Sequence, residues 1–326
     1  MSDPPPTPRA PADTPLAPVR TLRACELELE LGGARGPLLM GIVNASVDSF
    51  SDAGMYPRLE DRVRLARRLL EDGADILDVG GESASTGRPP TPVREEIELV
   101  APLVERLAGE LGALVSVDTY KPDVARAAIA AGARIVNDVS GLRDVELARV
   151  CADSGAALVL MHTRAAPRER LQDPDLYADV AAEVQAFLQE RVAAALEQGV
   201  SFEQILIDPG PDFAKTPAQT IELLRTVERL HALGRPLLMA ISRKDFIGAL
   251  TGQPPRAREA GTLAALAHGV AHGAHVFRVH DVAAARDYLT VADALAGRTH
   301  PERELELGEH VRHEPPAPSE NARASR

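Results

Sequence analysis

Cysteine is scarce in this sequence of 326 residues, and its scarcity limits the classes of protein that the chain can belong to. Only Cys25 and Cys151 occur, and they form no CxxC pair. A disulfide framework or a structural zinc site is therefore not expected. The expected location is the reducing cytoplasm.

Long apolar runs and an excess of positive charge are also missing. No stretch approaches the roughly 18 uninterrupted apolar residues of a membrane span, so no membrane segment is expected. The first 18 residues contain seven prolines and no apolar segment typical of a secretion signal, which predicts a disordered tail. A net charge of −12 argues against a nucleic-acid-binding surface, but a few focused cations can still bind a small anion.

One unit recurs through the rest of the chain: a short apolar run, a polar turn and an amphipathic segment. The apolar runs lack polar alternation, as is typical of parallel strands covered on both faces. The eight runs are Leu38–Val43, Asp75–Val79, Ala113–Val117, Arg134–Val136, Ala157–Leu160, Gln204–Ile207, Pro236–Ile241 and His275–Val279.

The segments between these runs have helical patterns. After the second run, apolar residues recur at three- and four-residue spacing, which builds one apolar stripe from Ile97, Val100, Ala101, Val104 and Leu107. Glycines that can adopt the left-handed conformation follow several helical segments and predict their ends; they are Gly73, Gly132, Gly155, Gly199 and Gly273.

Eight strand–helix units predict an α/β protein with a single closed (β/α)8 TIM barrel over residues 21–297. A proline-rich disordered tail is expected over residues 1–20, and a charged, disordered tail over residues 298–326. An open, doubly wound sheet is the alternative architecture.

Every predicted strand ends in polar or ionisable residues, at the edge where such barrels carry their active sites. Carboxylates and amides such as Asp118, Asn137 and Asp208 suit a flat heterocycle with adjacent donors and acceptors. Cations such as Lys244, Arg278 and His280 suit phosphate oxygens. The full set is Asn44, Glu82 with Ser83, Asp118, Asn137 with Asp138, Met161 with His162, Asp208, Ser242 to Lys244, and Arg278 to Asp281.

The order of these motifs resembles the dihydropteroate synthases. The run from Met40 to Asp52, MGIVNASVDSFSD, is similar to the first signature of that family, and GADILDVGGES at Gly73–Ser83 is similar to the second. Five further matches follow in the same order: Ser116–Thr119, Ile135–Val139, Asp208–Gly210, Ser242–Lys244 and Arg278–Asp281. The resemblance runs from about Leu38 to Leu295.

The resemblance implies a pterin site. Asp118, Asn137 and Asp208 correspond to the groups that bind the amino and ring nitrogens of the pterin. Lys244, also expected to be catalytic, contacts the ring, and Arg278 flanks it. Phe213 and Met161 correspond to apolar surfaces against the ring faces. His162 is expected to pack or support rather than to bind a ligand.

The resemblance also implies the rest of the reaction. A diphosphate leaving group is expected among Asn44, Arg278 and His280, with Mg²⁺ bound by Asn44 and diphosphate oxygens. Asp48 and Phe50 are expected to cover the cation left on the pterin, while Arg88 and Asp245 line the site of the arylamine, p-aminobenzoate. No nucleophilic side chain is required, and members of the family are typically homodimers.

The sequence departs from the family pattern in several places. Ser46-Val47 replaces Thr-Pro, and the segment between Ser83 and Arg88 is longer, so that the family threonine matches either Ala84 or Thr86. Asp245 replaces a serine that lies at a helix N-terminus and receives the carboxylate of p-aminobenzoate. Asp212 replaces a glycine.

These departures leave two alternatives to the expected enzyme. In one, the same chemistry uses a different arylamine, with Asp245 paired to Arg88 or facing an amine without a carboxylate. In the other, the chain is a pterin-binding paralogue without turnover. A pterin–corrinoid methyltransferase would share the barrel and the pterin carboxylates, but the diphosphate cluster and the first signature argue against it.

Overall fold

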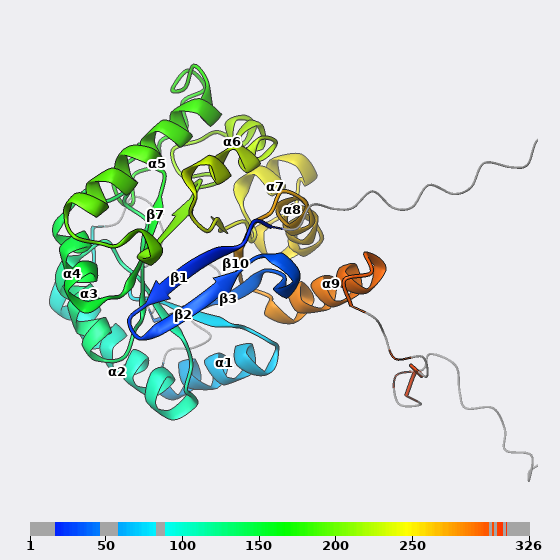
Figure 1. Ribbon diagram of the computed structural model, residues 1–326, viewed down its shortest axis with the longest axis horizontal. Helices are drawn as coiled ribbons and strands as arrows, with labels where there is room; N and C mark the ends of the chain where they lie inside the picture. Colours follow the sequence, from blue (N-terminus) through cyan, green and yellow to red (C-terminus); the bar gives the residue numbers. More distant parts are fainter. Residues whose placement is uncertain are drawn as a thin grey trace, which may run out of the picture.

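The computed structural model describes residues 17–45, 58–82 and 89–299, together with residues 302, 305–308 and 311 (Figure 1). The predictions for Asp48, Phe50 and Arg88 therefore lie outside the described residues. The same holds for the departures at Ser46-Val47 and between Ser83 and Arg88.

Eight parallel strands form one sheet in the order β8-β7-β6-β5-β4-β3-β10-β9. A further parallel bridge between Ile207 and Leu237 joins the two ends of this order, so the sheet closes into a barrel. All eight predicted strands are confirmed, and the open-sheet alternative is wrong. The strands are β3 Leu38–Asn44, β4 Ile76–Gly80, β5 Val115–Asp118, β6 Ile135–Asp138, β7 Ala157–Met161, β8 Ile205–Asp208, β9 Leu238–Met239 and β10 Val276–Val279.

Helices surround the barrel (Figure 1). The glycines expected to end helices all have positive φ angles, and at Gly132 a Cβ would also lie 2.7 Å from the Cβ of Ala108. The α-helices are α1 Leu59–Glu71, α2 Val93–Leu111, α3 Pro122–Ala130, α4 Glu146–Ser154, α5 Val180–Glu197, α6 Pro217–Leu224, α7 Asp245–Thr251, α8 Glu259–Ala271 and α9 Val282–Leu295. Short 3-10 turns are η1 Gly33–Arg35, η2 Phe202–Gln204, η3 Val227–Leu233 and η4 Pro255–Ala257.

The apolar stripe of α2 differs in part from the prediction. Val100, Val104 and Leu107 are buried, but Ile97 is half-buried and Glu96 is buried beside it. The Glu96 carboxylate accepts hydrogen bonds from Lys121 Nζ (2.5 Å) and Thr119 Oγ1 (2.9 Å), which offset the cost of its burial.

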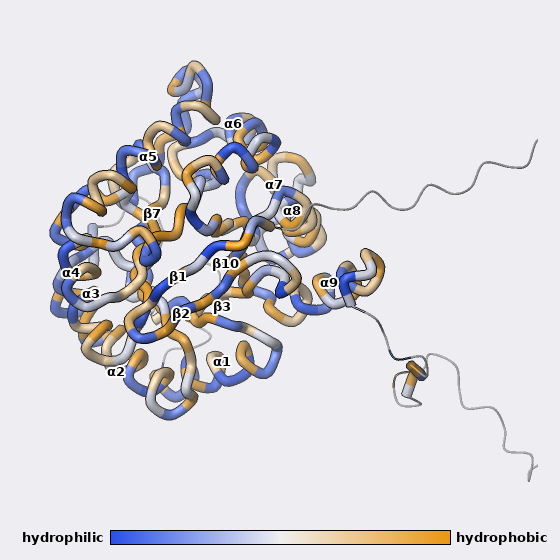
Figure 2. The backbone as a smooth tube through the Cα atoms, viewed as in Figure 1, coloured by the Kyte–Doolittle hydropathy of each residue, from blue (hydrophilic) through white to orange (hydrophobic). Residues whose placement is uncertain are grey.

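An antiparallel hairpin that the sequence reading did not predict closes one end of the barrel. Its strands, β1 Arg20–Ala24 and β2 Leu27–Leu31, lie across the centre of the ring in Figure 1. Leu22, Ala24 and Leu31 pack in one cluster with the apolar residues that fill the barrel interior. Figure 2 shows the corresponding apolar colouring along the central strands β3, β7 and β10. The hairpin therefore extends the apolar core beyond the amino ends of the barrel strands.

Residues at both ends of the described chain make hydrogen bonds with the barrel and its helices. The carbonyl of Pro18 accepts a hydrogen bond from His275 Nε2 (2.7 Å), and the amide of Thr299 donates to Asp293 O (3.3 Å). Residues 17–20 and 298–299, which the sequence reading assigned to tails, thus contact the barrel and α9. No helix in the described part of the chain is long and apolar enough to cross a membrane.

Candidate active site

The interior of the barrel changes from apolar to polar along the strands. Side chains of a strand alternate between the interior and the helices outside. Near the strand starts the inward-facing residues form an apolar cluster that includes Met40, Ile76, Ile135, Leu206 and Val276. At the carboxyl ends the inward-facing positions are occupied by Asn44, Asp78, Asp118, Asn137, Asp208 and Arg278. The resulting polar floor lies at the end of the barrel opposite to the hairpin.

Arg278 connects three strands of this floor. Its Nε donates to Asp78 Oδ2 (2.6 Å), and its Nη2 donates to Asp118 Oδ2 (2.9 Å). Asn137 Nδ2 also donates to Asp78 Oδ2 (3.2 Å). Burial raises the pKa of the Asp118 carboxyl, and the positive charge of Arg278 acts against this rise. The network fixes the direction of the guanidinium and of both carboxylates.

Asp78 is a site residue that the sequence reading missed. Its side chain has no exposed surface, and its Oδ1 has no hydrogen-bond partner among the described residues. The Ser116 hydroxyl, on the paired position of β5, likewise has none. Asp78 lies inside an apolar run, but it is two residues after the inward-facing Ile76, and this spacing is the signal that could have identified it.

Asp208 faces the floor from β8. It is 2% exposed, and its Oδ1 accepts a hydrogen bond from Gly210 N (2.7 Å). Burial raises its pKa to about 6, while that hydrogen bond and the nearby Lys244 and Lys215 oppose the rise. Met161, 1% exposed, is paired with Asp208 in the register of β7 and β8.

Lys244 and Phe213 lie together beside Asp208. Lys244 Nζ is 4.3 Å from the centroid of the Phe213 ring, within the range of a cation–π contact. Burial lowers the pKa of Lys244, and the negative charges of Asp212 and Asp208 act against this change. The loops after β8 and β9 thus place an aromatic face, a cation and a carboxylate at one side of the floor.

Lys215, also missed by the sequence reading, supports the loop after β8. It has no exposed surface, and Nζ donates to the carbonyls of Gly210 (2.9 Å) and Phe213 (3.0 Å). His162 Nδ1 lies 2.8 Å from the same Nζ, and its ring packs against Tyr177 and Phe187. Burial and Lys215 lower the pKa of His162 to about 2, so its ring is neutral. The supporting role expected for His162 is consistent with these contacts.

His280 and Asn44 lie at the ends of neighbouring strands. The amide and Nδ1 of His280 both contact Ser242 Oγ, at 3.2 and 2.9 Å. Burial, with Arg243, Arg278 and Lys244 nearby, lowers the pKa of His280 to about 3, which favours an uncharged imidazole in the ligand-free protein. Asn44 ends β3 next to Gly80, and β3 pairs with β10, which carries Arg278.

Two other strand-end carboxylates have structural partners. Asp138 accepts hydrogen bonds from the amides of Ser140 (2.8 Å) and Leu142 (2.5 Å) and does not join the floor. Glu82 accepts from Lys121 Nζ (2.8 Å) and from Thr91 N (2.7 Å), which ties the beginning of α2 to the end of β4.

Asp245 is the first residue of α7. It pairs with Arg258, whose Nη1 lies 3.1 Å from Oδ1. The amide of Asp245 instead donates to Asp212 Oδ2 (2.5 Å). The acceptor-side departures at positions 212 and 245 are therefore in direct contact.

Comparison with known proteins shows the family to which this chain belongs. The sequence profile described as "Pterin binding enzyme" matches residues 40–280. A dihydropteroate synthase of Synechocystis sp. is 42% identical over 259 residues, covering 79% of this chain and 89% of the relative. The chain belongs to the dihydropteroate synthase family of pterin-binding enzymes.

Solved dihydropteroate synthase structures agree with the fold. The Xanthomonas albilineans dihydropteroate synthase with 4-aminobenzoic acid has a TM-score of 0.76 at 44% identity, covering 84% of this chain and 98% of that one. The same enzyme in complex with 7,8-dihydropteroate has a TM-score of 0.73 at 43% identity, with the same coverage. The TIM barrel and the family predicted from sequence are confirmed.

Proposed function

We propose that this protein condenses a 6-hydroxymethyl-7,8-dihydropterin diphosphate with p-aminobenzoate, giving 7,8-dihydropteroate and diphosphate, as a step of folate biosynthesis. The observation that carries the proposal is the polar floor, in which Asp118, Asn137 and Asp208 face inward beside Lys244 and Arg278. The aminopyrimidine edge of a pterin presents adjacent N–H donors and a ring nitrogen. Two carboxylates, on β5 and β8, and an amide on β6 match that edge.

Asp78 strengthens the fit to a ligand rich in N–H donors. Its buried Oδ1 has no partner in the described part of the chain, and an unpaired buried carboxylate oxygen is costly. A donor on the bound pterin would satisfy it. Arg278, held by Asp78 and Asp118, would then lie at the edge of the ring with a fixed orientation.

The chemistry requires the C–O bond at the pterin's methylene carbon to break, and its electron pair leaves with the diphosphate. The arylamine nitrogen then forms the new C–N bond and loses a proton to solvent. Arg278 and the N–H of His280 stabilise the charge of the departing group, while Phe213 and Lys244 position the ring. Asp48 and Phe50 remain the proposed cover of the intermediate, and Arg88 with Asp245 the proposed acceptor wall.

A magnesium ion is proposed at the diphosphate. No group of three or more His, Cys, Asp or Glu side chains that could hold a metal occurs among the described residues. Asn44 offers an amide oxygen, the ligand type that Mg²⁺ prefers, and the substrate's diphosphate oxygens would complete the site. The bound ion would neutralise part of the charge of the leaving group.

A homodimer in the cytoplasm is proposed as the working form. α7 exposes Leu250, and α9 exposes Val291 and Leu295, apolar side chains that a second copy would cover. Light scattering on the purified protein should give twice the chain mass of 34.7 kDa. A single-chain mass at micromolar concentration would contradict the dimer.

The test of the activity is direct. Purified protein, Mg²⁺, the dihydropterin diphosphate and p-aminobenzoate should yield dihydropteroate, measured by mass spectrometry, and chelation of Mg²⁺ should suppress it. Retained pterin binding without product with any arylamine would instead identify a non-catalytic paralogue.

A further inference from the structure

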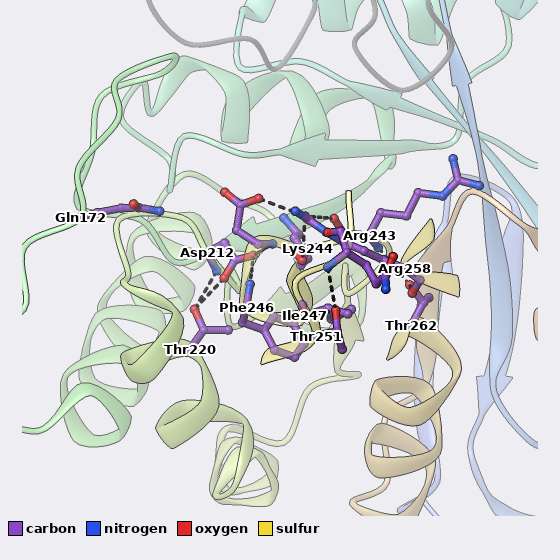
Figure 3. Close-up of polar contacts among 12 residues, drawn as sticks. Gln172, Asp212, Thr220, Arg243, Lys244, Phe246, Ile247, Thr251, Arg258 and Thr262 are labelled. Atoms are coloured by element: carbon purple, nitrogen blue, oxygen red, sulfur yellow. Dashed lines mark hydrogen bonds and ion pairs between the residues drawn. The ribbon is translucent and has the colours of Figure 1, made fainter. Parts of the chain in front are cut away.

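Asp212 occupies an unusual position next to the proposed site. It lies on the loop after β8, with a left-handed φ of 66°, and it is flanked by Pro211 and by Phe213, whose ring contacts Lys244. A positive φ is uncommon for residues other than glycine, and Asp is one of the residues that adopt it most readily. Figure 3 shows it between Thr220 on α6 and the beginning of α7 at Phe246.

The contacts of the Asp212 carboxylate occupy both of its oxygens. Oδ2 accepts hydrogen bonds from the amides of Asp245 (2.5 Å) and Phe246 (3.4 Å), the first two residues of α7. Oδ1 accepts from Thr220 Oγ1 (3.0 Å), which in turn accepts from the Asp212 amide (3.0 Å). A carboxylate from within the chain therefore satisfies amides that a bound carboxylate would otherwise use.

Two cations lie near Asp212. The negative charges of Asp212 and Asp208 are the ones that act most strongly on Lys244. Arg258 Nη1 donates to the carbonyls of Arg243 (2.9 Å) and Lys244 (3.1 Å) as well as to Asp245. The carboxylates of Asp212 and Asp245 therefore both lie at the beginning of α7, and Arg258, the partner of Asp245, is already engaged.

We propose that Asp212 is a specificity-determining residue that shifts acceptor preference away from arylamines with a negative charge opposite the amine, and towards neutral ones. The inference rests on the proposed function, in which the acceptor ring lies beyond Lys244, with its far end against the beginning of α7. A carboxylate on the acceptor at that end is repelled by the negative charge of Asp212. The amides of Asp245 and Phe246 already donate to Asp212, so they are not available to this carboxylate. A carboxamide of the same shape avoids the repulsion.

The experiment compares p-aminobenzoate with p-aminobenzamide as acceptors, at saturating dihydropterin diphosphate and Mg²⁺. Its readout is the ratio of kcat/KM for the acid to kcat/KM for the amide. Both amines attack the same bound pterin, so changes in pterin affinity cancel in this ratio. Asp212→Asn keeps the shape and a hydrogen-bond acceptor but removes the charge.

The ratio should rise at least tenfold in Asp212→Asn, because a unit charge about 4 Å away changes binding about fivefold with the screening of bulk water and by more at a partly buried site. Asp212→Gly, which suits the positive φ and frees both amides, should raise it at least as much. Asp179→Asn is the matched control: Asp179 caps α5 by accepting from Ala182 N, and its loss should leave the ratio unchanged.

The outcomes separate the two proposals. Product with either amine and a ratio that is the same in wild type, Asp212→Asn and Asp212→Gly would overturn the role of Asp212 while leaving the proposed function intact. Absence of product with both amines in the wild-type protein would overturn the proposed function, and the acceptor inference with it.

Discussion

Arg278 and Asp78 form an ion pair inside the barrel, with Nε 2.6 Å from Oδ2 of a carboxylate that has no exposed surface. The pair links β10 to β4 and, through the second bond of Arg278 to Asp118, to β5. The guanidinium is thereby oriented before any ligand binds. Such preorganisation is what stabilisation of a departing anion requires.

Asp78→Asn should release this orientation. We expect KM for the dihydropterin diphosphate to rise at least tenfold. The free energy of unfolding should fall by about 1.5–3 kcal/mol, because a charged hydrogen bond is lost in a buried place. Steady-state kinetics and urea unfolding measure the two effects.

Asp138→Asn is the control for this change. Asp138 is also buried at a strand end, but it binds the amides of Ser140 and Leu142 and not Arg278. This variant should lose stability and keep its KM for the pterin. An unaltered KM for the pterin substrate in Asp78→Asn would contradict the assignment of Asp78 to the pterin site.

Pterin affinity should depend on pH through the buried carboxylates. Burial raises the pKa of Asp208 to about 6 and that of Asp118 to about 7, and the ionised carboxylates accept N–H donors more strongly than the protonated forms. Affinity should therefore increase as the pH rises from about 5 to about 8, through both pKa values, and then level off. Titration calorimetry of a dihydropterin measures it, and Asp208→Asn should bind weakly with a flatter profile.

The stability of the ligand-free protein should follow the opposite trend. Because folding raises the pKa of Asp208 from 3.8 to about 6, the folded state retains a proton that the unfolded state has lost between these values. The stabilisation from this group is full below pH 3.8 and is lost as the pH rises through 6. A contribution from Asp208 that grows over this window, judged against Asp208→Asn, would contradict the assignment.

Lys215→Met should weaken pterin binding without unfolding the barrel. The carbonyls of Gly210 and Phe213 would lose their donor, and the loop that carries Asp208 and Phe213 would lose its support. We expect KM for the pterin substrate to rise about tenfold, within the range for loss of a buried charged hydrogen bond. An unaltered KM together with native circular dichroism would show that the loop holds without Lys215.

The hairpin should contribute to stability and not to catalysis. Leu22 is fully buried in the barrel interior, so Leu22→Ala should lower the free energy of unfolding by about 2–5 kcal/mol. Leu27→Ala, at a 37% exposed position of β2, should cost less than about 1 kcal/mol. Both should keep wild-type kcat, since the hairpin covers the end of the barrel opposite to the polar floor. A lowered kcat in Leu22→Ala would contradict this separation.

The strands and most of the floor could be predicted because their signals are local. Continuous apolar runs predict strands β3 to β10. The polar residues at the ends of these runs include Asp118, Asn137 and Asp208 of the floor. The hairpin has a weaker signal, the alternation of Leu27, Leu29 and Leu31 with glutamates over a single short strand. The alternation of a strand also separates Asn137, which faces the floor, from Asp138, which does not.

The contacts of the floor could not be predicted, because they join residues that are far apart in the sequence. Asp78 and Arg278 are separated by 200 positions, and Asp212 reaches α7 across 33. Asp212 binds the first amides of α7, and Arg258 pairs with Asp245. Arg88, the partner that the sequence offered for Asp245, lies outside the described residues.

The central claim is that one pterin binds on the floor formed by Asp118, Asn137 and Asp208. A crystal structure of the protein with 6-hydroxymethyl-7,8-dihydropterin tests it most directly. We expect the ring nitrogens within about 3.2 Å of both carboxylates and of the Asn137 amide, the usual hydrogen-bond range. A pterin bound elsewhere, with these three side chains still in contact only with protein and water, would contradict the account.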